Sequence, residues 1–318
     1  MKQLELGTGG NTNEDQSNII AAVALCVALF GIATASILTV VAQQEMSPNA
    51  ITFNRLGFAT LAFSVWNRIQ GTTKTQVQFS YSRRDWSLIL IAGISFAVSL
   101  VLWAWSLTQT SVANSTLLNN MMPIFTTVGA WLVFGKSFPL RFLLGMAIAV
   151  GGAIAIGIED LHVGKSILGD AAALLAAMFA AFYLLSLEQL RLKFATPVVM
   201  QWTNLVGSLC VFALMLLTNE RLFPVSWGGW VAAIALALVC QVVGQGLIAY
   251  SLARFSAGLV AVLMLVIPVI AAILAMVMFA EKLSLWNWLM FTVVLVGIYI
   301  AVSVRVGVTA PLRENEQV

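Results

Sequence analysis

Residues 257–279 read AGLVAVLMLVIPVIAAILAMVMF, which is 23 consecutive residues without a charged or hydrogen-bonding side chain. A helix needs about 20 mostly apolar residues to cross a hydrocarbon core of ~30 Å. This stretch is therefore long enough and apolar enough to cross a membrane. Runs of similar length and composition recur along the chain between Asn18 and Arg305. The pattern predicts an all-α integral membrane protein that crosses the bilayer many times.

We expect ten transmembrane helices. Their predicted ranges are 19–41, 49–66, 87–108, 112–134, 140–158, 168–188, 197–218, 228–251, 257–279 and 285–304. The composition agrees, since 60% of the residues are hydrophobic and only 9% are charged. The connecting segments are short, so the sequence predicts no separate aqueous domain.

The N-terminal segment lacks the basic start, short apolar core and cleavage site of a signal peptide, so we expect the first helix to be retained. The three cysteines, Cys26, Cys210 and Cys240, all lie within predicted helices, where a thiol behaves as a small apolar group. His162 is the single histidine and lies outside them. The sequence therefore predicts no disulfide framework, no metal site and no cofactor.

The basic residues predict the orientation in the membrane. If the N-terminus is cytoplasmic, twelve lysines and arginines fall on the cytoplasmic side and three, Lys165, Arg221 and Lys282, on the other. Cytoplasmic loops carry the excess of basic residues in membrane proteins. We therefore expect a multi-pass protein of the cytoplasmic membrane with both termini in the cytoplasm. Its basic residues are expected to meet lipid headgroups, and no nucleic-acid partner is needed to explain them.

An internal repeat divides the chain into two halves. The segment Ala104-Trp-Ser-Leu-Thr-Gln-Thr-Ser111 returns as Ala249-Tyr-Ser-Leu-Ala-Arg-Phe-Ser256, 145 residues later, and the same offset carries Pro123 onto Pro268. Five helices per half is an odd number, so the second half must be inverted relative to the first. Inverted repeats recur in secondary transporters, which bind substrate near the midplane between the halves.

This division predicts five parts of the chain. They are a cytoplasmic tail at 1–18, a first five-helix repeat at 19–158, an extracytoplasmic linker at 159–167, a second five-helix repeat at 168–304 and a cytoplasmic tail at 305–318.

The chain resembles the EamA family of the drug/metabolite transporter superfamily over its whole membrane region. The resemblance rests on the two five-helix halves, the repeated Ala-aromatic-Ser-Leu segment, the matching prolines and the short charged turn that follows each of them. That turn usually reads small-Glu-x-Leu in the family. Residues 280–283 fit, whereas Gly135-Lys136-Ser137-Phe138 has lysine in place of glutamate. Such proteins carry amino acids, nucleosides, vitamins, drugs or nucleotide sugars, so the resemblance implies a transporter without naming its substrate.

The fourth predicted helix has the richest polar face. Thr116, Asn119, Asn120 and Pro123 lie on one broad stripe with helical spacing. The amides either form hydrogen bonds between helices or contact the substrate. Pro123 and Pro268 each remove a backbone donor and are expected to kink their helices, as a purely structural feature or as part of a gate.

Arg55 is the single cation within a predicted helix, and Thr52 lies one turn before it. An offset of 149 residues places Gln201 and Asn204 at the matching positions of the second half. The guanidinium either extends to the membrane interface or offers its donors to a carboxylate in a cavity.

Four further residues complete the predicted substrate site. Gln241 and Gln245 are four residues apart and form either a polar wall or a helix junction. Trp103 and Tyr183 supply either amphipathic cavity surface or part of the interfacial belt.

A row of small residues, Gly145, Ala149, Ala153 and Gly157, recurs every four positions in the fifth predicted helix. Such a row allows close helix packing, either within one chain or in a homodimer.

No carboxylate lies securely at the centre of a predicted helix, which favours uniport, exchange or ion coupling through neutral ligands over proton antiport. Glu188 is the best remaining carboxylate candidate, and an exposed ion pair with Arg191 is the simpler interpretation. The sequence has no catalytic or nucleotide-binding motif that we can identify, so we expect no enzyme.

These features together predict a secondary transporter that moves a small metabolite, such as an amino acid or a related amphipathic solute, by alternating access. We expect its cavity to be bounded by helices two, three, four, seven, eight and nine. An integral-membrane enzyme and a receptor or scaffold that transports nothing are the alternatives.

Overall fold

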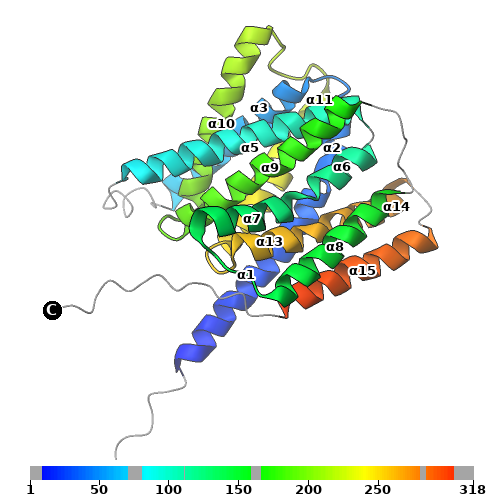
Figure 1. The fold of residues 1–318 in the computed structure, drawn as a ribbon. Helices are drawn as coiled ribbons and strands as arrows, with labels where there is room; N and C mark the ends of the chain where they lie inside the picture. Colours follow the sequence, from blue (N-terminus) through cyan, green and yellow to red (C-terminus); the bar gives the residue numbers. More distant parts are fainter. Residues whose placement is uncertain (1–8, 71–80, 111, 159–165, 280–283, 304–318) are drawn as a thin grey trace, which may run out of the picture.

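The computed structural model describes the chain except for residues 1–8, 71–80, 111, 159–165, 280–283 and 304–318. Every regular element in the described part is helical, and the helices form one bundle (Figure 1). The predicted turn at 280–283, most of the predicted linker, residues 1–8 of the predicted N-terminal tail and all of the predicted C-terminal tail fall outside the described residues.

The helices of the first half are α1 (Gly9–Ala33), α2 (Ala35–Ala42), α3 (Pro48–Ile69), α5 (Arg83–Gln109), α6 (Val112–Asn119), α7 (Met122–Phe134) and α8 (Leu140–Ile158). Those of the second half are α9 (Ile167–Arg191), α10 (Thr196–Thr218), α11 (Trp227–Ala235), the π-helical segment η1 (Leu236–Gln245), α12 (Gly246–Ser251), α13 (Ala257–Leu263), the 3₁₀ turn η2 (Met264–Val266), α14 (Ile267–Phe279) and α15 (Leu285–Val302).

Eight helical stretches among the described residues are long and apolar enough to cross a membrane. The other two predicted crossings are also helical, but they fall short of this criterion for different reasons. In α3, polar residues such as Asn54, Arg55 and Asn67 lower the mean hydropathy. In α8, only Leu140–Ile156 count toward the criterion, although the helix continues to Ile158. The structure thus agrees with a multi-pass membrane protein, and the count of ten crossings stays a prediction.

Serine side chains begin several of the helices. Ser47 precedes Pro48, and its hydroxyl accepts a hydrogen bond from the backbone of Ala50 at the start of α3. Ser82 and Asp85 form a capping box at the start of α5. A serine in the same position caps α9, α11, α13 and α15. These caps satisfy backbone donors that the helix itself leaves free, and they fix where each helix begins.

Close packing joins the last helix of each half. The helices α8 and α15 lie side by side (Figure 1). A Cβ on Gly145 would lie 2.4 Å from the backbone nitrogen of Ala301, and one on Gly297 would lie 2.4 Å from that of Ala149. The small residues predicted at 145 and 149 therefore let α8 pack against α15 of the same chain.

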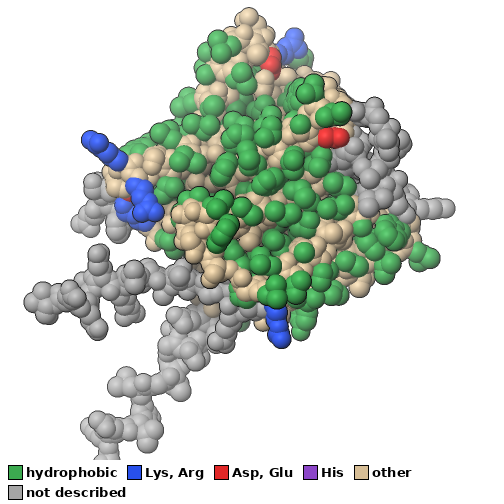
Figure 2. Space-filling view, viewed as in Figure 1, with side chains coloured by type: hydrophobic (Ala, Val, Ile, Leu, Met, Phe, Trp, Pro, Cys, Tyr) green, Lys and Arg blue, Asp and Glu red, His purple; other side chains and the backbone are tan. Residues whose placement is uncertain are grey.

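The outer surface is strongly apolar. Figure 2 shows hydrophobic side chains over most of one face, with lysine and arginine near its margins. Large side chains such as Trp131, Leu132 and Leu217 are more than half exposed. A soluble monomer rarely exposes so much apolar surface, whereas lipid tails cover it at no cost.

Candidate functional site

A cavity of about 160 Å³ lies inside the bundle. Both halves of the chain line it, through α1, α2, α3, α5, α6 and α7 on one side and α9, η1, α13, η2 and α14 on the other. Pockets for drug-sized ligands are usually about 300–1,000 Å³, so this cavity suits a smaller solute.

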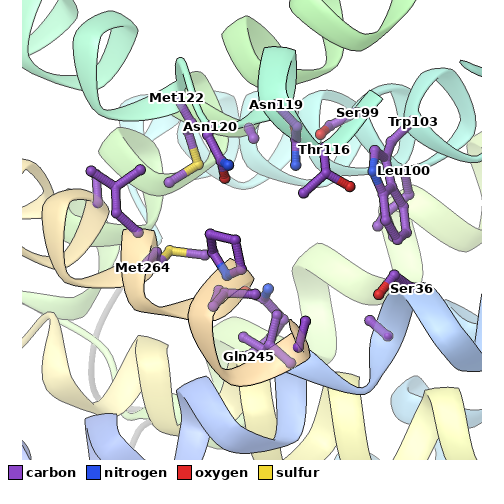
Figure 3. Close-up of a pocket in the computed structure, with 18 of the residues that line it drawn as sticks. Ser36, Ser99, Leu100, Trp103, Thr116, Asn119, Asn120, Met122, Gln245 and Met264 are labelled. Carbon is purple, nitrogen blue, oxygen red and sulfur yellow. The ribbon is translucent and has the colours of Figure 1, made fainter. Parts of the chain in front are cut away.

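One wall of the cavity is polar. Thr116, Asn119 and Asn120 point into it from the end of α6, and Gln245 faces them from the opposite side (Figure 3). The amide nitrogen of Asn120 is buried and has no hydrogen-bond partner among the described residues. A buried amide without a partner is costly, so this group is available to a ligand or to water.

The rest of the wall is mainly apolar. Trp103 and Leu100 lie at one end, and Met122 and Met264 lie on opposite sides of the other end (Figure 3). Phe96 also lines the cavity and stacks on Tyr183, with ring centroids 4.1 Å apart. The cavity therefore offers both apolar surface and hydrogen-bonding groups.

Two helix breaks lie beside the cavity, at matching places in the two halves. The first separates α6 from α7, which begins at Met122, and the second separates α13 from α14, which begins at Ile267. Pro123 and Pro268 follow these two residues and line the cavity. Because proline has no N–H, Pro123 cannot donate to the carbonyl of Asn119. The prolines thus accompany real interruptions of their helices.

Arg55 is a buried cation on the cavity wall. It lines the cavity, and only 4% of its surface is exposed, so it does not reach the lipid-facing surface. Its Nε donates to Oε1 of Gln241 over 3.0 Å, and Nε2 of Gln241 donates to Oδ1 of Asn204 over 2.8 Å. No hydrogen bond from its terminal nitrogens to another described residue is found.

No described carboxylate pairs with Arg55. The two ion pairs in the described part of the chain are Lys136–Glu188 and Lys193–Asp85. A buried charge usually has a partner, because its removal from water costs several kcal/mol. Arg55 therefore presents an unneutralised positive charge to the cavity.

The cavity brings together eight of the residues predicted from the sequence. They are Arg55, Trp103, Thr116, Asn119, Asn120, Pro123, Gln245 and Pro268.

The other five predicted site residues lie outside the lining. Thr52 donates to the carbonyl of Pro48, Gln201 accepts from Asn67, and Tyr183 donates to the sulfur of Met200. Gln241 and Asn204 lie behind Arg55. The expectation that the seventh predicted helix, α10, bounds the cavity is wrong, whereas α1, α2 and α9 contribute to the lining unexpectedly.

Sequence reasoning also missed Ser36, Phe96 and Ser99, which line the cavity. Each is a single serine or aromatic residue within an apolar run, and such residues are common on faces that pack against other helices. The break between α1 and α2 at Thr34 has no proline to mark it, and Gly31 lies three residues before it.

Glu188 takes part in a contact between the halves. Both of its carboxylate oxygens accept from Nζ of Lys136 over 2.8 Å, and Oε1 also accepts from the backbone of Ala257 over 3.1 Å. The predicted exposed pair with Arg191 is wrong, because Glu188 is buried and Arg191 donates to the carbonyl of Ala249 instead. Lys136, which stands where the family usually has glutamate, is therefore paired with an acid from α9.

At the opposite end of the bundle, two carboxylates join the loop before α3 to the loop after α10. Glu45 accepts from Ser226, and these hydrogen bonds lower the pKa of its carboxyl. Burial raises the pKa of Glu220, but hydrogen bonds from Ser47 and Asn49 outweigh it, so that its pKa lies below the usual value. Both groups are thus held in the charged form.

The model of the EamA-like transporter family matches residues 19–158 and 167–303. The pseudopaline exporter CntI of Pseudomonas aeruginosa PAO1 is 24% identical over 247 residues, which cover 78% of this chain and 82% of that protein. The same exporter from strain UCBPP-PA14 is 23% identical over the same lengths. A protein crystal structure superposes with a TM-score of 0.75 at 15% identity, covering 89% of this chain and 97% of the other. At this identity the superposition shows the fold alone.

Proposed function

Since the chain belongs to the EamA-like transporter family, as its sequence predicts, we propose that it is a secondary transporter that carries a small metabolite through the cavity by alternating access. The family and the exporters that the chain resembles support a multi-pass membrane transporter of small metabolites. The alternating-access mechanism and the substrate class are our proposal, and features of the structure support both.

The observation that carries the proposal is the unneutralised charge of Arg55. A guanidinium presents a planar set of donors that matches a carboxylate, and the bond between them is short and strong. In the cavity, no protein carboxylate among the described residues occupies this partner position. We therefore propose that the substrate supplies the carboxylate.

The remaining lining favours a zwitterionic or amphipathic solute. The side-chain oxygens of Asn119 and Asn120 can accept from an ammonium group, and Phe96 and Trp103 can pack on an apolar side chain. An amino acid or a related compound combines these three groups. The volume of about 160 Å³ agrees with a solute of this size.

Alternating access requires elements that can bend on both sides of the substrate. The helix breaks at Met122 and Ile267 begin 145 residues apart, the offset of the sequence repeat, and the family model matches each half separately. We propose that these breaks are the hinges and that the halves are inverted relative to each other.

The proposed orientation places the cavity toward the outer side of the membrane. With both termini in the cytoplasm, the Lys136–Glu188 contact lies at the cytoplasmic ends of α7 and α9. The relatives are named exporters, so we propose that this chain also works outward. An enzyme or a receptor that transports nothing remains the competing hypothesis.

Counterflow in proteoliposomes tests the proposal. Purified wild type, Arg55→Ala and Arg68→Ala are compared with a panel of labelled amino acids, nucleosides and organic cations. Arg68 lies on the same helix but is exposed, so its loss controls for the loss of a cation.

We expect the wild type and Arg68→Ala to exchange a carboxylate-bearing solute and Arg55→Ala to lose at least about tenfold in apparent affinity, the effect of a charged hydrogen bond. Exchange of carboxylate-bearing solutes that Arg55→Ala leaves unchanged would contradict the assignment of Arg55. Exchange of no solute by the folded wild type would favour the competing hypothesis.

A further inference from the structure

Two buried amides stand directly behind Arg55. Gln241 accepts from the Nε of Arg55, and its own nitrogen donates to Asn204. Gln241 is fully buried, and Asn204 is 1% exposed. Neither residue lines the cavity, so neither can contact a solute there directly.

The direction of these hydrogen bonds follows from Arg55. A guanidinium can only donate, so Gln241 must turn its oxygen toward Arg55 and its nitrogen toward Asn204. Asn204 must then present its oxygen, which leaves its nitrogen without a partner in the described part of the chain. The arginine thereby fixes the orientation of both amides.

The residue at position 241 determines whether Arg55 is neutralised within the protein. Its side-chain oxygen lies 3.0 Å from Nε of Arg55, which is within the distance of an ion pair. An amide at this position holds the guanidinium without cancelling its charge, whereas a carboxylate would cancel it. Among the described residues of the lining, Arg55 is the one that carries a charge, so none of the others compensates it.

We propose that Gln241 is a positioning residue that sets the charge of the cavity and thereby selects solutes with an anionic group. The selection of solutes rests on the proposed transport function, whereas the charge of the cavity does not depend on it. A carboxylate at position 241 is expected to occupy Arg55 from within and to remove the preference for anionic solutes.

The fold can accept this substitution. Glutamate has nearly the same volume as glutamine, so Gln241→Glu creates neither a hole nor a clash. The unpartnered nitrogen of Asn204 would donate to the new carboxylate after rotation of its amide. The substitution therefore changes the charge while it retains a hydrogen bond on both sides of position 241.

The charge can be measured without knowledge of the substrate. Ser36 lines the cavity, and Ser36→Cys is introduced after Cys26, Cys210 and Cys240 are replaced by alanine. We then compare the rates at which two methanethiosulfonate reagents of similar size label this cysteine. One carries an anionic ethylsulfonate group and the other a cationic ethyltrimethylammonium group. The rate with the anionic reagent divided by the rate with the cationic reagent, normalised to the same quotient for a free thiol, reports the local electrostatic potential.

Two variants separate charge from structure. Gln241→Met removes the acceptor of the Arg55 hydrogen bond without adding a charge. Gln70→Glu adds the same charge at the exposed far end of α3. We expect the ratio to favour the anionic reagent with glutamine at position 241, to fall at least about fivefold in Gln241→Glu, and to change little in both controls. An equal ratio with glutamine and with glutamate at position 241 would overturn the charge assignment.

Counterflow of labelled L-leucine and L-leucinamide with the same proteins tests the selection itself. The amide lacks the carboxylate, so the wild type should exchange the acid in preference and Gln241→Glu should lose this preference. If Gln241→Glu still prefers the acid as strongly as the wild type, the inference is wrong. A wild type that exchanges neither compound, while its reagent ratio falls on substitution, would contradict the proposed transport of amino acids but support the charge assignment.

Discussion

Asn54 is buried within α3, whereas Asn120 lies at the break between α6 and α7 with its amide nitrogen buried, and their hydrogen bonds assign them different tasks. Asn54 donates to the carbonyls of Ala50 and Leu222 and so connects α3 to the loop after α10. Asn120 lines the cavity, and its nitrogen has no partner among the described residues. The sequence placed Asn120 on a polar stripe but left open whether its amide joins helices or contacts the substrate, and its unpartnered nitrogen favours the second interpretation.

Asn120→Ala should weaken solute binding without weakening the fold. It removes a buried donor that has no protein partner, so the melting temperature should stay the same or rise. The apparent KM for the solute should rise about five- to twentyfold.

Asn54→Ala should instead lower the free energy of unfolding by about 1–3 kcal/mol, because the carbonyl of Leu222 loses its donor, and it should leave the apparent KM unchanged. Thermal unfolding and counterflow of the two variants check this. A lower melting temperature with unchanged KM in Asn120→Ala would show that its amide supports the fold.

At the scale of elements, the contact between α8 and α15 depends on glycine. A Cβ on Gly297 would lie 2.4 Å from the backbone of Ala149, whereas one on Gly151, on the same α8 helix, would meet nothing within 4 Å. The backbones of α8 and α15 are therefore too close to admit a side chain at position 297. A Cβ there would require the two helices to separate along their interface.

Gly297→Ala should therefore destabilise the protein by more than about 2 kcal/mol, because the helices must separate. Gly151→Ala should be neutral or stabilise it by about 0.5–1 kcal/mol, since alanine loses less conformational entropy within a helix. The melting temperatures of the two variants in the same detergent provide the measurement. Equal melting temperatures would show that α8 and α15 are not in close backbone contact at Gly297.

The interruptions within helices show what sequence reasoning can and cannot reach. Pro123 and Pro268 predicted that two helices would be irregular, and both are broken beside these residues. The π-helical segment Leu236–Gln245 carries no proline, and it was not expected. This segment packs closely against α1, since a Cβ on Gly31 would lie 3.1 Å from the carbonyl oxygen of Val239, and the local sequence does not show such a contact.

At the scale of the whole molecule, the apolar runs predicted the membrane class, because it depends on their length and recurrence along the chain. The resemblance to the family rested instead on the repeated Ala-aromatic-Ser-Leu segment and the matching prolines. Which residues line the cavity was harder to predict from the sequence. The polar stripe of residues 116, 119 and 120 does face it, but Gln201 and Asn204 on α10, which match Thr52 and Arg55 in the repeat, do not. Which face of a helix meets the cavity depends on how helices distant in the sequence pack. Arg55 illustrates this limit, since its partner Gln241 is 186 residues away.

The central claim is that one cavity opens to each side of the membrane in turn, and a cysteine in that cavity tests it most directly. Ser36→Cys, in the background without other cysteines, is exposed to a membrane-impermeant thiol reagent from the outside of right-side-out vesicles and of inside-out vesicles. Alternating access predicts labelling from both sides, with a transported solute shifting the balance between them. Labelling from one side alone, whatever solute or gradient is applied, would contradict the account.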